Sequence, residues 1–326
     1  MSEAEPGAGA GRRRVALWIL RILGTAAGIA YVAWKVDLGD VESAISRVAP
    51  LAVAAACAIT AVNLVLGALR WRVLLAAYGA PRPPRIARLV HAYFVGFFYN
   101  TYLPGGVGGD VVRGVVTRSA FGEEGSTSAT ASVAVVLVER VLGLSGLLLV
   151  VSGTSLVEPL PGTEGVLPFS AALLVAALSG VALLAMGRRL APRLPARLEA
   201  IAAALPKIER PLPFGAALGM SLVTQALIAL TGWVLLASIT AGEVTLGDAL
   251  VLVPLAMAAV YFPFSVGGSG VREAAFVALG TRALGMSEGD ALAASLLLWI
   301  TQLAVGGVGG VLSLVAPLEA RARDER

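Results

Sequence analysis

Two short stretches, PGGVGGDVVR at residues 104–113 and PFSVGGSGVR at residues 263–272, decide how this chain folds. Aligned on their prolines, they are identical at six of ten positions, and their offset of 159 residues is close to half of the 326-residue chain. Proline removes a backbone donor and stops a helix, and paired glycines permit backbone conformations closed to other residues. We therefore predict two breaks in an otherwise helical chain.

The sequence around the breaks has the composition of a membrane protein. Hydrophobic residues make up 57% of the chain and charged residues 14%, whereas soluble domains carry about 25% charged residues. A helix needs about 20 apolar residues to cross a bilayer. Runs near or above this length occur at 15–34, 50–69, 127–152, 166–187, 214–238 and 291–315. We therefore predict an all-α polytopic membrane protein with about six full transmembrane helices.

Rare residue types exclude several classes of site. A single cysteine, Cys57, excludes a disulfide framework and cysteine-based metal centres. A single histidine, His91, and the lack of an HExxH motif argue against a histidine-ligated metal hydrolase. The chain also has no GxxxxGK[ST] nucleotide-binding motif. We expect no metal, no cofactor and no nucleic-acid partner, and we interpret His91 as a packing residue.

Basic residues predict the orientation, because short cytoplasmic loops carry an excess of Lys and Arg. These residues gather at 12–14, 70–88, 188–210 and 321–326, whereas 153–165 and 239–248 contain none. The basic segments, with tails at 1–14 and 316–326, are therefore expected in the cytoplasm. Abundant Ala, Arg and Gly are typical of GC-rich bacterial genomes. We predict a multi-pass protein of the bacterial cytoplasmic membrane.

This orientation makes the chain around each break start and end on the same side of the membrane. Regions 87–126 and 249–290 must each cross an even number of times, as two full spans or as a re-entrant hairpin. Their second arms, 105–125 and 265–284, carry several glycines and charges and make poor spans. We therefore predict two glycine-broken re-entrant helical hairpins.

The two hairpins also predict an inverted repeat within one membrane domain at 15–315. The halves, about 15–152 and 166–315, would start on opposite sides of the membrane. Inverted repeats with broken helices recur in transporters, where the substrate site lies at the breaks. The alternative is chance similarity in a chain rich in Gly and Val.

Charged residues near the breaks are the candidates for chemistry. Freed N–H groups at the start of a half-helix attract anions, and Arg113 and Arg272 could hold a phosphate bidentately. The alternative is that the glycines permit tight packing and the arginines reach to the interface.

Glu139 and Arg140 fall near the middle of an apolar run, where a charge costs about 2.5–3.5 kcal/mol. Either a structural ion-pair lock or a substrate role would account for them. We expect each to pair with a residue of a break: Glu139 with Arg113 or Arg272, and Arg140 with Asp110 or Glu273.

Other polar residues are given structural roles. Asn100 precedes the first break and is interpreted as a helix-end residue or a headgroup contact. The Arg70–Trp71–Arg72 stretch is interpreted as an interfacial anchor, with lipid-headgroup binding as the alternative. Interhelical hydrogen bonds are expected from Asn63, Gln225 and Gln302.

Four motifs, LRWRVLL (69–75), NTYLPGGVGGDVVR (100–113), VLVERVLG (136–143) and FPFSVGGSGVRE (262–273), carry a family resemblance. Together they resemble the lysylphosphatidylglycerol synthase transmembrane-domain family, also called flippase-like or UPF0104. The residues that match its motif positions are Asn100, Pro104, Gly105, Asp110, Arg113, Glu139, Arg140, Pro263, Ser265, Gly267, Gly268, Gly270, Arg272 and Glu273. With Gly109, they form the predicted substrate-binding set.

The resemblance implies lipid movement. In two-domain relatives, the membrane part moves aminoacylated phosphatidylglycerol, and a cytosolic domain makes that lipid. Because the chain ends soon after the last span, we do not expect synthase activity. We predict a non-enzymatic flippase for an anionic or aminoacylated phospholipid or a lipid-linked glycan. Candidate proton carriers are Glu139, Asp110 and Glu273.

Two other functions remain open: a membrane-embedded lipid-modifying enzyme, or a non-transporting subunit of an envelope-assembly complex. Expected partners are the bilayer, a lipid substrate, and either a second copy of the chain or a separate lipid-synthesis enzyme.

Overall fold

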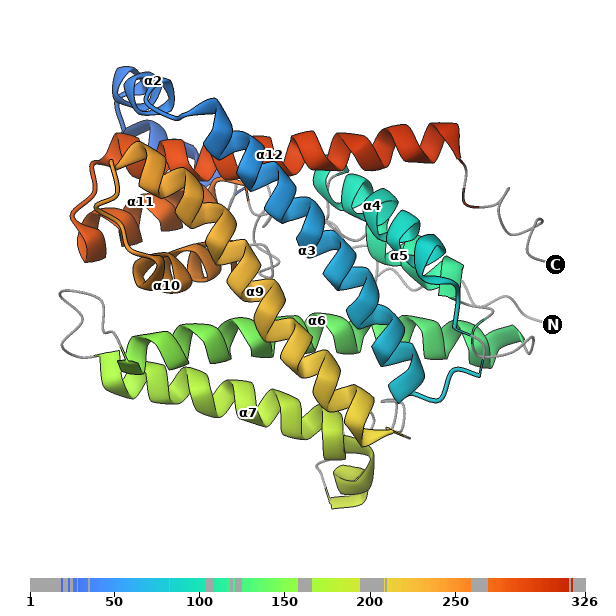
Figure 1. Ribbon diagram of the computed structural model, residues 1–326. Coiled ribbons are helices and arrows are strands. Elements are labelled where there is room, and N and C mark those ends of the chain that lie inside the picture. Colours follow the sequence, from blue (N-terminus) through green and yellow to red (C-terminus); the bar gives the residue numbers. More distant parts are fainter. Residues whose placement is uncertain are drawn as a thin grey trace.

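The computed structural model describes residues 19, 23, 26–27, 29–34, 36–81, 83–103, 108–117, 120, 125–157, 166–193, 208, 210–258, 269–316 and 318. Within these residues the regular elements are helices (Figure 1), which confirms the all-α prediction for this part of the chain. The elements are α2 (Leu38–Ser46), α3 (Pro50–Ala77), α4 (Ile86–Tyr102), α5 (Gly108–Thr117), α6 (Gly125–Val157), α7 (Val166–Leu190), η2 (Ala191–Arg193), α9 (Pro211–Ile239), α10 (Leu246–Met257), α11 (Val271–Leu284) and α12 (Glu288–Val315).

Four of these helices are long and apolar enough to cross a membrane. They are α3, the described part of α6 (Val135–Val157), α9 and α12, and they fall on four of the six predicted runs. The run at 166–187 forms α7, a helix of 25 residues. The run at 15–34 is described only in part, and its residues 29–34 are helical. The chain is thus a membrane protein with several apolar helices.

Shorter helices flank the two predicted breaks. Helices α4 and α5, of 17 and 10 residues, lie on either side of the first break. Helices α10 and α11, of 12 and 14 residues, flank the second. At 1.5 Å per residue, α5 is about 15 Å long, half of a hydrocarbon core of about 30 Å. The breaks themselves, at 104–107 and 259–268, lie outside the described residues, and their re-entrant arrangement stays a prediction.

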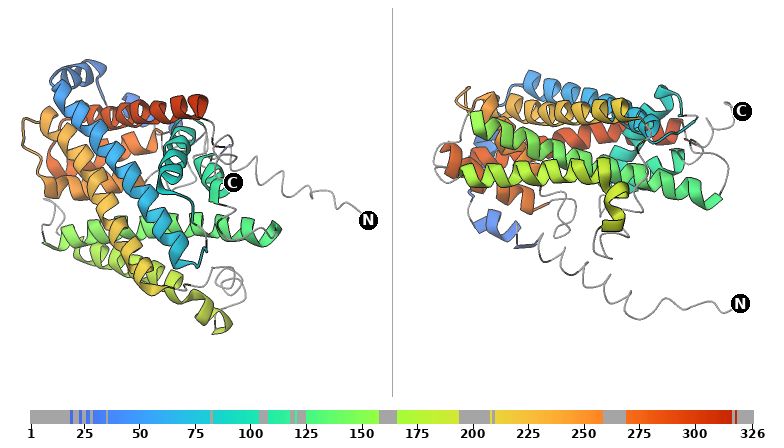
Figure 2. Two further views of the ribbon diagram at one scale, coloured as in Figure 1. Left: turned by 45° about the vertical axis from the view of Figure 1, so that its right-hand side comes forward. Right: turned by 90° about the horizontal axis from the view of Figure 1, so that it is seen from below.

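Helices α3 and α9 form an antiparallel pair and lie side by side. Ala49 at the start of α3 donates its N–H to Ser238 near the end of α9, and Arg210 before α9 donates its N–H to the carbonyl of Ala77. Figure 2 shows α3 and α9 as one outer layer, with α6, α7 and α12 behind them. Helices α3 and α9 therefore each pack against the other and against α6 and α12.

Glycines let α12 approach α4 closely. A Cβ on Gly309 would lie 2.0 Å from the carbonyl oxygen of Phe94, and one on Gly310 would lie 2.8 Å from the ring of Phe98. Helices in membranes associate largely through such small-residue contacts, because lipid gives no hydrophobic drive between them. The packing of α12 on α4 therefore depends on these two glycines.

We predict that Gly309→Ala destabilises the protein by about 1–3 kcal/mol, the usual cost of overpacking. The methyl group would overlap backbone atoms of α4. A flexible side chain could move away from the new methyl group, but these backbone atoms cannot. Thermal unfolding of the purified protein in detergent measures the effect. The matched control is Gly307→Ala, two residues away, where the nearest atom to the new Cβ is the Tyr102 hydroxyl at 3.6 Å. Equal stability of the two variants would contradict the prediction.

Candidate functional site

Glu139 is the centre of a buried ion cluster in the first half of the chain. This residue lies in α6 and is 2% exposed. Its Oε1 accepts hydrogen bonds from Arg70 Nη2 at 2.9 Å and from the Tyr93 hydroxyl at 2.6 Å. Its Oε2 accepts one from Arg113 Nη1 at 2.6 Å. One carboxylate therefore joins helices α3, α4, α5 and α6.

Asp110 adds a second carboxylate to this cluster. It pairs with Arg113 of its own helix, α5, and its Oδ2 accepts a hydrogen bond from Arg140 Nε of α6 at 2.5 Å. Of the alternative partners expected from the sequence, the structure confirms Arg113 for Glu139 and Asp110 for Arg140. We refer to the Glu139 cluster as Arg70, Tyr93, Asp110, Arg113, Glu139 and Arg140.

Aromatic rings complete the surroundings of Arg113. Its guanidinium carbon lies 4.9 Å from the centroid of the Tyr93 ring and 5.6 Å from that of the Trp71 ring. A cation over an aromatic face is attracted by the ring quadrupole, and the attraction strengthens when water is excluded. The Arg113 side chain is buried, so it does not reach to the interface. Both Arg113 and Trp71 point into the bundle.

The interpretation of Arg70 and Trp71 as an interfacial anchor is wrong. Arg70 is 7% exposed and Trp71 is fully buried. Besides Glu139, Arg70 Nη1 bonds the hydroxyls of Ser221 and Thr224 of α9, at 3.1 and 3.3 Å. The reason is that α3 continues to Ala77, so Arg70 lies two turns inside the helix. In the sequence, the apolar residues that follow Arg72 indicated that the helix continues beyond Arg70 and Trp71.

A second ion pair lies at the start of α11. Arg272 is 3% exposed; it pairs with Glu273, and its Nε lies 3.0 Å from Glu273 Oε1 and 3.3 Å from Ser295 Oγ of α12. Glu273 Oε2 accepts the N–H of Gly270 at 2.7 Å. Gly270 has φ +78°, a conformation that favours glycine. Arg272 and Glu273 therefore satisfy each other, and neither joins the Glu139 cluster through the pairs described.

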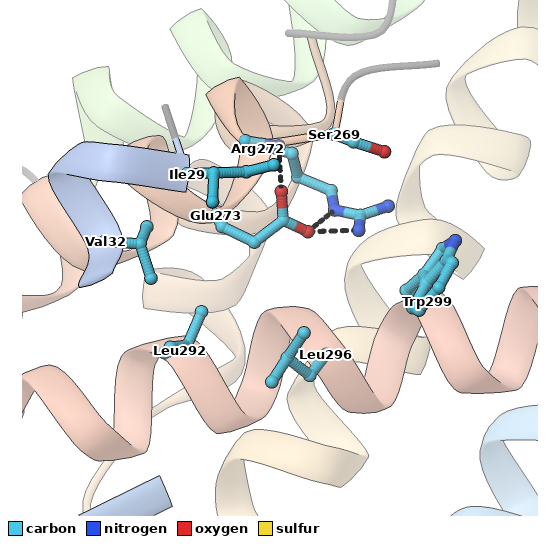
Figure 3. A pocket seen from close by; sticks show the side chains of 9 residues that line it. Ile29, Val32, Ser269, Arg272, Glu273, Leu292, Leu296 and Trp299 are labelled. Carbon is cyan, nitrogen blue, oxygen red and sulfur yellow. Dashed lines mark hydrogen bonds and ion pairs between the residues drawn. The ribbon is translucent and has the colours of Figure 1, made fainter. Parts of the chain in front are cut away.

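A cavity of about 260 Å³ lies against this second pair (Figure 3). Side chains of α12 and of the first apolar run form its walls, and the Arg272–Glu273 pair lies beside it. Its lining is mostly apolar, with the charged pair and one serine as exceptions. The lining residues are Ile29, Val32, Ser269, Gly270, Arg272, Glu273, Leu292, Leu296 and Trp299.

Asn100 acts between α4 and α5. Its side-chain oxygen accepts the N–H of Gly109 at 2.8 Å, one of the N–H groups that a helix start leaves without an intrahelical acceptor. Gly109 packs so closely that a Cβ there would lie 2.1 Å from the carbonyl oxygen of Gly96. In this structure both residues therefore serve helix packing, which agrees with the helix-end interpretation of Asn100.

Two other residues match their expected roles. His91 is buried, as a packing residue should be. Gln225 of α9 donates from Nε2 to the carbonyl of Gly143 in α6 at 3.0 Å, which confirms its interhelical hydrogen bond. Across the described residues, no three His, Cys, Asp or Glu side chains form a group that could hold a metal ion.

The remaining predicted site residues lie in the breaks. The prediction that the two breaks meet at one substrate site depends on them, and it stays a prediction. These residues, all outside the described part of the chain, are Pro104, Gly105, Pro263, Ser265, Gly267 and Gly268.

We predict that Glu139→Gln destabilises the protein by about 3–5 kcal/mol, the usual cost of removing one partner of a buried ion pair. The amide keeps the shape of the side chain but leaves Arg70 and Arg113 without their shared negative charge. Chemical unfolding in detergent measures the loss. The control is Glu243→Gln, an exposed carboxylate whose change should shift stability by no more than about 0.5 kcal/mol.

A double-variant cycle separates the ion pair from general packing. Adding Arg70→Met to Glu139→Gln should cost less than the sum of the two single changes, because residues of one network are not additive. Strict additivity would show that Glu139 does not act through Arg70.

Comparison with known proteins agrees with the motifs. The model of the lysylphosphatidylglycerol synthase TM region matches residues 18–310. A UPF0104 membrane protein of Methanothermobacter thermautotrophicus is 32% identical over 117 residues, which is 35% of this chain and 32% of that relative. The match thus spans about a third of the relative's length. Because the family model covers most of the chain, this protein belongs to the lysylphosphatidylglycerol synthase TM-region family.

Proposed function

We propose that this protein moves lipids with polar headgroups across the membrane. The observation that carries the proposal is the Glu139 cluster: three arginines and two carboxylates on helices of a membrane bundle. Charged residues inside membrane proteins are costly and mark substrate or ion pathways. The family name, which refers to the synthase of an aminoacylated phospholipid, supports a lipid as the substrate. The protein itself performs no chemistry on the lipid.

The substrate class follows from arginine chemistry. Guanidinium groups bind phosphate and carboxylate oxygens through paired hydrogen bonds. An anionic or aminoacylated phospholipid and a lipid-linked glycan all carry a phosphate beside their polar headgroup. This shared phosphate is the group that the arginines recognise, whereas the acyl chains remain in the bilayer.

Arg140 is the arginine of the cluster best placed to meet a headgroup. Arg113 is buried and uses both terminal nitrogens on Glu139 and Asp110. The Arg140 side chain is 37% exposed and contacts the same Asp110 from α6. A headgroup phosphate can therefore approach Arg140 without breaking the buried pairs. We therefore assign phosphate binding, first expected of Arg113, to Arg140.

The packing of the described helices supports the inverted repeat as part of this proposal. If α3, α4, α5 and α6 are exchanged with α9, α10, α11 and α12, the main contacts map onto one another. Helix α4 packs on α12 as α10 packs on α6, and α6 packs on α9 as α12 packs on α3. Helices α4 with α5, and α10 with α11, would then be the two re-entrant hairpins.

The distribution of charge supports the proposed orientation. The loop between α9 and α10 and the starts of α10 and α12 carry Glu243, Asp248, Glu288 and Asp290. The opposite ends of the bundle, near the end of α3 and the start of α9, carry several arginines. We place the basic end, with both termini, in the cytoplasm of a bacterial cell.

The experiment is lipid movement in proteoliposomes that hold the purified protein. A fluorescent phosphatidylglycerol in the inner leaflet becomes accessible to an impermeant quencher once it has moved. Loss of a hydrogen bond to a charged group is worth about 1.5–3 kcal/mol, so Arg140→Ala should slow movement by about 10- to 100-fold. Arg72→Ala, which removes an exposed arginine outside the cluster, should leave the rate unchanged.

Three results would overturn the proposal. Protein-containing vesicles that move lipid no faster than empty ones would exclude flipping by the isolated protein. A change in the mass of the lipid after incubation would identify an enzyme instead. Movement that requires a co-purified partner would identify a subunit of a larger complex.

A further inference from the structure

Among the described helices, Glu139 and Glu273 are buried and Asp110 is partly buried. These three carboxylates differ in the number of cations around them. Glu139 is bonded by Arg70 and Arg113, and Tyr93 donates a further hydrogen bond. Asp110 is paired with Arg113 and Arg140. Among the ion pairs of the described residues, Glu273 has one cation, Arg272. Of the three carboxylates, Glu273 therefore has the fewest cationic partners among the described ion pairs.

Within the described part of the chain, the other surroundings of Glu273 carry no further charge. From α12, Ser295 lies 3.5 Å away through its hydroxyl, and the rest of the facing wall is apolar. The first apolar run contributes only Ile29 and Val32 to the cavity. Within α10, which packs on α11, the one ionisable residue is Asp248 in its first turn. Among the described residues, Arg272 is therefore the one cation paired with Glu273.

Glu273 already accepts hydrogen bonds from the two donors that an incoming anion would use. It accepts from the guanidinium of Arg272 and from the N–H of Gly270 at the start of α11. An anionic headgroup in the adjoining cavity would compete for both groups, and two anions could not share them without repulsion. Protonation of Glu273 removes that repulsion and leaves Arg272 with an uncompensated positive charge.

We propose that Glu273 takes up a proton when the phosphate of a lipid headgroup binds Arg272, so that lipid movement is coupled to protons. The inference rests on the proposed flippase function and deepens it. The proton comes from water at the cavity and returns to water when the headgroup leaves and the Arg272–Glu273 pair forms again. Glu139 and Asp110 are each paired with two arginines and take no part in this step.

The coupling is reciprocal by thermodynamic linkage. Headgroup binding favours the protonated form of Glu273, and acidity favours headgroup binding. Each pH unit changes the ratio of protonated to ionised carboxylate tenfold, so a gradient of one unit should change the rate by up to about tenfold. Movement should be faster from the acidic side to the alkaline side than in the reverse direction.

The first experiment measures the proton directly. The full-length protein in weakly buffered detergent is mixed with short-chain phosphatidylglycerol, and a pH-sensitive dye reports proton uptake. The wild type and Glu243→Gln, which changes an exposed carboxylate outside both ion clusters, should each take up a proton, whereas Glu273→Gln should take up none. Short-chain phosphatidylcholine, which carries no net negative charge, should cause less uptake. Absence of uptake by the wild type, or uptake that survives Glu273→Gln, would overturn the proposal.

A second variant controls for misfolding of Glu273→Gln at the start of α11. Glu273→Asp keeps a titratable carboxyl group at this position and should restore proton uptake. Both variants are compared with the wild type by size-exclusion chromatography and thermal unfolding. Uptake lost equally in Glu273→Gln and Glu273→Asp, with both folded, would show that the proton goes elsewhere and would overturn the assignment.

The second experiment imposes a pH gradient on proteoliposomes that carry fluorescent phosphatidylglycerol. The wild type should respond to the gradient, and Glu273→Gln should lose the response. Movement in the wild type that ignores the gradient would overturn proton coupling and leave the flippase function intact. If the wild type moves no lipid at all, the flippase function fails, and the dye measurement alone decides whether Glu273 takes up the proton.

Discussion

The carboxylate of Glu139 accepts hydrogen bonds from helices α3, α4 and α5, and the arrangement of these helices depends on it. An isolated carboxylate in a membrane interior would be too costly to keep ionised, and the same holds for the arginines around it. Together they satisfy one another, and each bond joins a different helix to α6. Arg70 extends the network to α9 through Ser221 and Thr224. The charges thus fix the positions of helices that apolar packing alone would leave free to slide or rotate.

In the second half of the chain, the arginine that aligns with Arg113 has different partners. Arg272 pairs with its own neighbour in α11 and reaches only Ser295 of α12. Helix α5 is therefore tied by charge to α6 and, through Glu139, to α3, whereas the described polar contacts of α11 run to one neighbour. The carboxylate with fewer described cationic partners, Glu273, lies beside a cavity.

Close helix contacts set a second constraint. Gly109 meets the backbone of α4, and Gly309 meets the same helix from α12. Both contacts bring backbone atoms together at distances that no side chain would allow. Helix α4 is therefore held on two sides, by glycines of α5 and of α12. This packing places Tyr93 against Glu139 and Asn100 against the start of α5.

The sequence by itself determined the membrane class, the helical content and the family, and it limited Glu139 and Arg140 to two possible partners each. These depend on local composition, on motifs and on the rule that buried charges must be paired. The tertiary structure alone decided that Arg70 and Trp71 face inward, because the end of α3 and its contact with α9 set their depth. It also decided that Arg272 pairs with Glu273 and not with Glu139. Which of several possible partners a charge meets depends on how helices far apart in the sequence are packed.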